Sequence, residues 1–183
     1  MASDVAFEAF PKIPRLKRGC VITEKIDGTN ACVYVGEDGL VLAGSRSRWV
    51  TPEADNFGFA AWVRDHEEDL RTLGPGRHWG EWYGAGIQRQ YGLYHKRFAL
   101  FNTSRWEFGG HPECCGVVPV LYTGDFTTDA VDIAIVGLRE HGSVAVPGWM
   151  QPEGVVVYHV AARSLMKVLV ENDGMPKGAS DAS

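Results

Sequence analysis

One lysine of this chain stands where a lysine side chain could act as a nucleophile. Lys25 lies in the segment EKIDGTN at 24–30, between an apolar run at 20–22 and another at 31–35. This pattern predicts a strand, a tight turn and a second strand, with the lysine at the end of the first strand. Gly28 can take φ > 0, and its polar neighbours can bond the turn's backbone, so the platform would be stiff. The ordinary alternative is a solvated lysine beside a hairpin turn.

A lysine is almost wholly protonated at pH 7, so a nucleophilic Lys25 would need help from its surroundings. Cations such as Arg46 and Lys167, or a bound metal ion, would disfavour its ammonium form. Two carboxylates, Glu81 and Glu153, could hold Mg²⁺, mostly through water. Glu81 sits between two tryptophans, which is typical either of a hydrogen-bonded core carboxylate or of a site residue.

The elements that must position these residues follow from hydrophobic spacing and turn signals. We expect strands at 39–43, 77–84, 98–102, 117–122, 155–160 and 165–170, of which 98–102 should be buried, and an irregular loop at 103–116. Four-three-four-three spacing predicts a helix over 59–73, and a Thr-Pro-Glu helix start precedes it at 51–53. A second helix is expected after a threonine cap at 127–129. The arginines of GSRSR at 44–48 should lie on an extended segment and point the same way.

Length and charge limit the possible classes of protein. The chain has 183 residues and a net charge of −5. We expect one domain at 20–170, an extended N-terminal lead-in at 1–19 packed on that domain, and a flexible C-terminal tail at 171–183. No apolar run reaches membrane-spanning length, so we expect a cytoplasmic protein without a membrane partner. Strands outnumber helices and few form βαβ units, which indicates the α+β class with antiparallel sheets and flanking helices.

The four cysteines do not form a recognisable framework. Their spacing gives neither a C-x-x-C motif nor a disulfide pattern. His111 with Cys114 and Cys115 could suggest zinc, but no second ligand pair has the required spacing, so buried or idle thiols are favoured. Free thiols agree with a reducing compartment.

Six stretches taken together carry a resemblance to a known family. They are EKIDGTN (24–30), GSRSR (44–48), GEWYG (80–84), FALFN (98–102), EGVVVY (153–158) and LMKVL (165–169). In this order and spacing they resemble the covalent nucleotidyltransferase superfamily of polynucleotide ligases and mRNA capping enzymes, and most closely its RNA ligase 2-like branch. The resemblance spans roughly 20–170 and implies an ATP-grasp-like ligase domain. It implies an ATP-dependent RNA ligase that joins a 3′-hydroxyl to a 5′-phosphate through a lysyl-AMP intermediate.

The resemblance also implies a role for each matching residue. Lys25 is the nucleophile, and Arg46 and Lys167 contact phosphate and complete the catalytic set. Glu153 and Glu81 are implied at the metal site, which would take Mg²⁺ or Mn²⁺. The nucleotide-binding residues implied are Glu24, beside the adenine edge, Ile26, Asn30, Arg46, Glu81, Lys167, and Phe101, which would stack on the purine.

Two departures from the family pattern leave alternatives open. The superfamily often has two lysines one residue apart in its last motif, and Leu165 stands where the first would be. These ligases usually carry a further domain after that motif, where this sequence has only 171–183. A DNA ligase, an end-adenylylating enzyme, a guanylyltransferase or a non-catalytic nucleotide-binding module therefore remain alternatives. We expect a monomer whose partners are ATP and RNA ends held by a template or structure.

Overall fold

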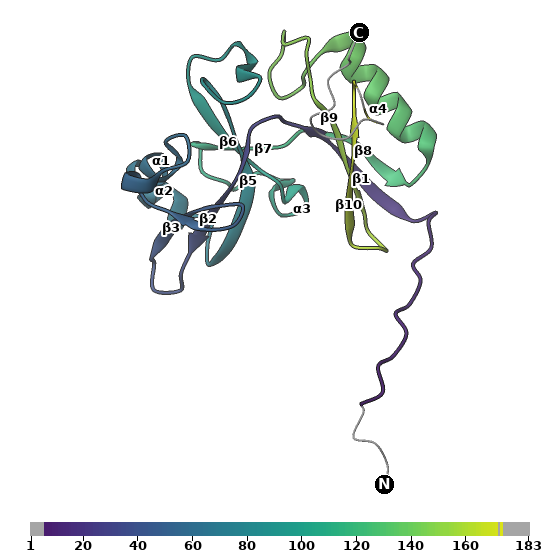
Figure 1. Ribbon diagram of the computed structural model, residues 1–183, viewed down its shortest axis with the longest axis horizontal. Coiled ribbons are helices and arrows are strands. Elements are labelled where there is room, and N and C mark those ends of the chain that lie inside the picture. The colour runs from purple at the N-terminus through teal and green to yellow at the C-terminus, as the bar shows by residue number, and fades with distance from the viewer. Residues whose placement is uncertain (1–5, 172, 174–183) are drawn as a thin grey trace, which may run out of the picture.

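The computed structural model describes residues 6–171 and 173, which form two β-sheets with helices on their outer sides (Figure 1). Helices α1 and α2 lie at one side of the molecule and α4 lies at the other, with both sheets between them. The α+β class with flanking helices is therefore confirmed. Most of the tail expected at 171–183 lies outside the described residues.

The first sheet has the strand order β10-β9-β1-β8 and is antiparallel throughout. Its strands are β1 (Gly19–Lys25), β8 (Val120–Asp125), β9 (Gly154–His159) and β10 (Ser164–Leu169). Burial alternates along β1, because every second side chain points at helix α4 (Thr128–His141). The threonine cap predicted for α4 is confirmed, since the Thr127 side chain accepts a hydrogen bond from the Ala130 amide.

The second sheet has the order β4-β3-β2-β5-β6-β7. Its strands are β2 (Thr29–Val35), β3 (Val41–Ser45), β4 (Trp49–Val50), β5 (Gly76–Gly84), β6 (Lys96–Leu100) and β7 (Cys115–Val117). All pairs are antiparallel except β6 and β7, which run parallel. One face packs on α1 (Phe59–Asp65) and α2 (Glu67–Arg71) in the largest hydrophobic cluster. The opposite face of β2 and β5 carries Asn30 and Glu81.

A third hydrophobic cluster joins the two sheets. Ile26, in the turn between β1 and β2, packs there with Tyr83, Tyr91 and Val146. Tyr91 belongs to a short 3-10 helix (Gln90–Gly92) in the loop between β5 and β6. The turn after Lys25 thus lies directly on the junction of the sheets.

The helix predicted over 59–73 is wrong as a single element. The chain forms α1 and α2 instead, and His66 between them leaves helical geometry at φ −116° and ψ 19°. The apolar spacing is nevertheless real, because Phe59, Val63 and Leu70 are all buried against the second sheet. Thr51 precedes a 3-10 helix (Pro52–Ala54), but its hydroxyl makes no capping hydrogen bond.

Other boundaries also differ from expectation. The strand predicted at 98–102 ends at Leu100, and the loop predicted at 103–116 contains helix α3 (Thr103–Trp106) and the start of β7. The strand predicted at 117–122 is divided between β7 and β8. The GSRSR segment is not extended after Ser45, because 46–48 form a turn in which Ser45 N donates to Arg48 O at 2.7 Å.

The described part of the N-terminal lead-in contacts the domain at its last residues, where Leu16 O accepts a hydrogen bond from His159 Nε2 and Arg18 O accepts one from Phe126 N. Its large apolar side chains are exposed, and the segment extends away from the sheets (Figure 1). All four cysteines are free, and no group of three or more metal-binding side chains occurs within 6–171 and 173. Burial raises the pKa of the Cys114 and Cys115 thiols, which agrees with unreactive cysteines. No helix among the described residues is long and apolar enough to cross a membrane.

Candidate active site at the junction of the sheets

Lys25 ends β1 and forms an ion pair with Glu153, which immediately precedes β9. Lys25 Nζ lies 2.5 Å from Glu153 Oε2, and both side chains are largely but not fully buried. Strand pairing brings them together, since Lys25 is opposite Gly154. This contact orients the lysine; because an ammonium group has no lone pair, a nucleophilic Lys25 would first have to lose a proton.

Glu81 lies close to this pair on β5 and is only 8% exposed. Gly28 N donates to Glu81 Oε1, and Asn30 Nδ2 donates to Glu81 Oε2, each at 3.0 Å. Burial raises the pKa of Glu81 to about 7, against the lowering effect of Asn30, of the nearby Lys25 ammonium and of the Gly28 amide. Glu81 therefore changes its charge in the physiological range, which is common for carboxylates that take part in function.

The turn that follows Lys25 is fixed by contacts from distant segments. A Cβ on Gly28 would lie 2.8 Å from Tyr83 Cβ and closer still to a carbonyl of β5, so only glycine fits there. Asp27 N donates to Tyr91 Oη at 2.7 Å, and Arg89 Nε donates to Asp27 Oδ2 at 3.1 Å. The stiff platform predicted from the sequence is thus present.

Glu24 points to the other side of β1 from Lys25, since successive side chains of a strand alternate. It is 1% exposed, and it accepts hydrogen bonds from Ser143 Oγ and from the amides of Val144 and Ala145. Its carboxylate therefore ties the loop after α4 to the strand that bears Lys25. A contact from Glu24 to adenine stays a prediction, as does nucleotide binding by Ile26, whose side chain is buried in the junction cluster.

Lys167 and Lys25 share one face of the first sheet. Lys167 is opposite Val156, and Val156 is opposite Thr23, two residues before Lys25. Strand spacings put the two lysine Cα atoms roughly 12 Å apart, so both long side chains can reach one phosphate group. Lys167 is exposed and therefore accessible to a ligand.

Two further predicted residues lie just past the ends of strands of the second sheet. Ser45 is opposite Ala31, so the turn that begins at Arg46 lies at the same end of the sheet as Asn30. Phe101 lies just past the end of β6 and is 39% exposed, so it is not the buried strand residue that we expected. Its backbone amide donates to Trp79 O, which extends the β5–β6 pairing by one step. Phe101 therefore lies on the Glu81 face, two residues from Ala99.

The donor set fits a divalent cation that is held mainly by its phosphate ligands. Mg²⁺ and similar ions commonly take only one or two protein carboxylates beside phosphates and water. Within the described part of the chain, one carboxylate oxygen of Glu153 accepts a hydrogen bond from Lys25 and the other accepts none, whereas both oxygens of Glu81 already accept hydrogen bonds. Glu153 is therefore the better candidate ligand of the two.

The sequence analysis missed several residues that build the site. Arg89 joins Asp27 to the segment before Glu153, because its Nη1 also donates to Gln151 O at 3.2 Å. Tyr91 supports the turn, and Ser143 supports Glu24. The only sequence signal for Arg89 and Tyr91 is the glycine-rich loop that surrounds them; Gln88, Gln90 and Tyr91 all have positive φ there.

Solved structures share this architecture. An Arg→Ala variant of the Naegleria gruberi RNA ligase with ATP and Mn superposes with a TM-score of 0.62 at 19% identity, and the match covers 85% of this chain and 51% of that one. A Glu→Ala variant with AMP and Mn gives a TM-score of 0.62 at 19% identity, covering 84% and 50%. The chain thus spans about half the length of these structures. At such identity the likeness shows the fold.

No curated protein matches the chain. A family model described as RNA ligase, however, matches residues 18–169, which include both sheets, the Lys25–Glu153 pair and Glu81. The chain therefore belongs to the RNA ligase family.

Proposed function

We propose that this protein is an ATP-dependent RNA ligase that acts through adenylylation of Lys25. The observation that carries the proposal is Lys25 itself, held at a strand end by Glu153 and beside Glu81. The family match supports it, and so do the Naegleria structures with ATP and Mn and with AMP and Mn.

In the proposed reaction, Lys25 Nζ first loses a proton, and the Glu153 carboxylate at 2.5 Å is the nearest acceptor. The amine attacks the α-phosphorus of ATP, an N–P bond forms, and pyrophosphate leaves. A 5′-phosphate oxygen of RNA then attacks the lysyl-AMP, and the N–P bond breaks. Finally the 3′-hydroxyl attacks that 5′-phosphate and AMP leaves. A bound divalent cation would neutralise phosphate charge; the protein's part is positioning and charge stabilisation.

The test is incubation with α-labelled ATP or GTP, followed by a denaturing gel. Wild type should carry covalent label from ATP, and Lys25→Ala should carry none. Lys17→Ala, which removes a lysine of the exposed lead-in, is the matched control and should label normally. Label on the Lys25→Ala protein at the wild-type level would refute the proposal, and label from GTP alone would favour a guanylyltransferase.

A further inference from the structure

A row of aromatic side chains crosses the second sheet on the face that carries Glu81. Phe101 N donates to Trp79 O, Trp79 is opposite Cys32, Cys32 is opposite Gly44, and Gly44 is opposite Trp49. Residues opposite one another on neighbouring strands point to the same face. Phe101, Trp79 and Trp49 therefore lie in one line across β6, β5, β2, β3 and β4, a span of roughly 19 Å. We call these three residues the aromatic row.

The aromatic row is open to solvent. Phe101, Trp79 and Trp49 are 39%, 40% and 47% exposed. Between the two tryptophans the row passes Cys32, whose small side chain is buried, and Gly44, which has no side chain. A Cβ on Gly44 would lie 3.2 Å from the Trp49 ring, so the ring lies across the glycine. Large exposed aromatic surface of this kind commonly marks a binding site.

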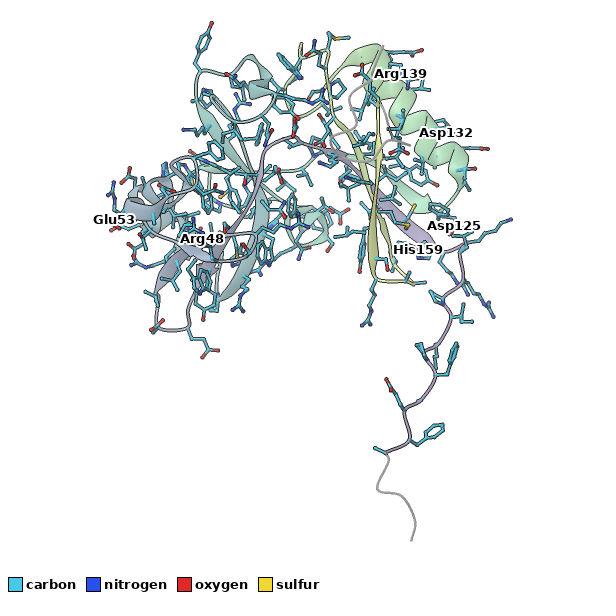
Figure 2. The ribbon with its side chains drawn as sticks, viewed as in Figure 1. Arg48, Glu53, Asp125, Asp132, Arg139 and His159 are labelled. Atoms are coloured by element: carbon cyan, nitrogen blue, oxygen red, sulfur yellow. The ribbon has the colours of Figure 1, made fainter. Side chains whose placement is uncertain are left out.

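Arg77 lies at the Trp49 end of the row, and Arg46 and Arg48 belong to the turn just before Trp49. The Arg77 guanidinium lies 5.5 Å from the Tyr34 ring centroid and 5.9 Å from that of Trp49. Arg48 directly precedes Trp49, and Figure 2 shows it on the side of the molecule away from α4. Among the described residues, the ion pairs involve none of Arg46, Arg48 and Arg77. These guanidinium groups are thus available to phosphates.

We propose that the two tryptophans of the aromatic row bind a single-stranded segment of the RNA substrate and lead it to the reaction site. Bases stack on Trp79 and Trp49, and the arginines contact the phosphates. Stacking needs unpaired bases, and each base has a π-face, so this contact requires a single strand but little sequence preference. Trp79 and Glu81 are two residues apart on β5, about 7 Å, which is close to one nucleotide step. The identity of the strand as RNA rests on the proposed function.

The experiment titrates the full chain with a ten-nucleotide oligo(U) and follows binding by the tryptophan fluorescence of the protein. The fluorescence anisotropy of an end-labelled oligo(U) strand provides a second signal. Trp79→Leu should weaken binding about 5- to 150-fold, the range for loss of one base–aromatic stack. Trp79→Phe should restore most of the affinity, since it restores a ring. Tyr94→Ala, which removes a fully exposed aromatic from the loop before β6, is the matched control and should bind like wild type. Arg77→Gln should lower the salt slope by about 0.7.

Labelling by ATP on the same proteins separates this inference from the proposed function. A Trp79→Leu protein that still labels but has lost oligo(U) affinity supports the row as an RNA site. Failure of wild type to label refutes the ligase proposal and leaves the binding result intact. Oligo(U) binding of Trp79→Leu equal to wild type overturns the inference. So does an equal loss of affinity for a fully paired duplex, because paired bases cannot stack on the row.

Discussion

Glu81→Gln should remove a pH-dependent loss of stability from this protein. Glu81 is buried at the junction of the sheets, and burial raises the pKa of its carboxyl to about 7 from a reference value of 4.5. Below pH 4.5 both the folded and the unfolded chain hold the proton. Between pH 4.5 and 7 the unfolded chain releases it and the folded chain keeps it, so the free energy of unfolding falls as pH rises. Above pH 7 both states are ionised.

The size of this loss follows from the difference between the two pKa values. One pKa unit corresponds to about 1.4 kcal/mol, so a shift of this size gives about 3 kcal/mol between pH 4.5 and 8. Glutamine keeps the shape and cannot titrate. Its side-chain amide has one acceptor oxygen where the carboxyl group has two. The variant therefore also loses one hydrogen bond, from Gly28 or Asn30, at every pH. The prediction therefore concerns how the difference in free energy of unfolding between wild type and Glu81→Gln changes with pH. The part of that difference that is the same at every pH does not test it.

The assay is urea unfolding of both proteins at half-unit steps from pH 4.5 to 8, read by tryptophan fluorescence. Relative to that of Glu81→Gln, the free energy of unfolding of wild type should fall by about 3 kcal/mol over this range. Glu140→Gln, an exposed residue of α4, is the matched control and should follow wild type at every pH. A constant difference between wild type and Glu81→Gln would refute the reasoning, because it would mean that Glu81 ionises equally in both states.

The remaining predictions concern the nucleotide, the metal and the strand end. Phe101→Ala should raise the ATP concentration for half-maximal labelling about 5- to 150-fold, the equivalent of about 1–3 kcal/mol of stacking. Phe101→Tyr keeps a ring and should match wild type. Equal behaviour of the Phe101→Ala and Phe101→Tyr proteins would exclude stacking. Excess EDTA should abolish labelling and added Mg²⁺ or Mn²⁺ should restore it; label that survives EDTA contradicts a metal requirement. Glu24→Gln should lower the free energy of unfolding by about 3 kcal/mol in urea, because it disrupts charge-assisted hydrogen bonds to Ser143 and the following amides, and an unchanged midpoint would count against that role.

Local patterns predicted the strands that bear the site. The alternation along β1, the β-forming runs of β9 and β10 and the threonine cap of α4 are short-range signals, and each element formed where its pattern lies. Lys25 could be placed at a strand end for the same reason. The two halves of the 59–73 segment show the limit of such signals, because apolar spacing fixes which side is buried but does not show that the helix breaks at His66.

Tertiary contacts could not be predicted in the same way. The partners of Glu24 lie about 120 residues further along the chain, and Glu153 is 128 residues from Lys25. Phe101 was assigned to a buried strand because its neighbours are apolar, but the strand ends one residue earlier and leaves the ring exposed. GSRSR has the composition of an edge strand, yet Ser45 bonds Arg48 and closes a turn. In each case the outcome depends on which segments meet, information that a local pattern does not contain.

The strand end that bears Lys25 is restrained from both of its faces. On the α4 side, Glu24 binds the loop at 143–145. On the other side, Lys25 meets Glu153, and the turn that follows is bound by Glu81 and by Arg89. Arg89 also bonds Gln151 O, so one guanidinium links the turn to the segment that presents Glu153. A displacement at phosphorus depends mainly on in-line positioning of the attacking atom. Restraint of this backbone by four separate segments is therefore what a nucleophilic lysine at this position requires.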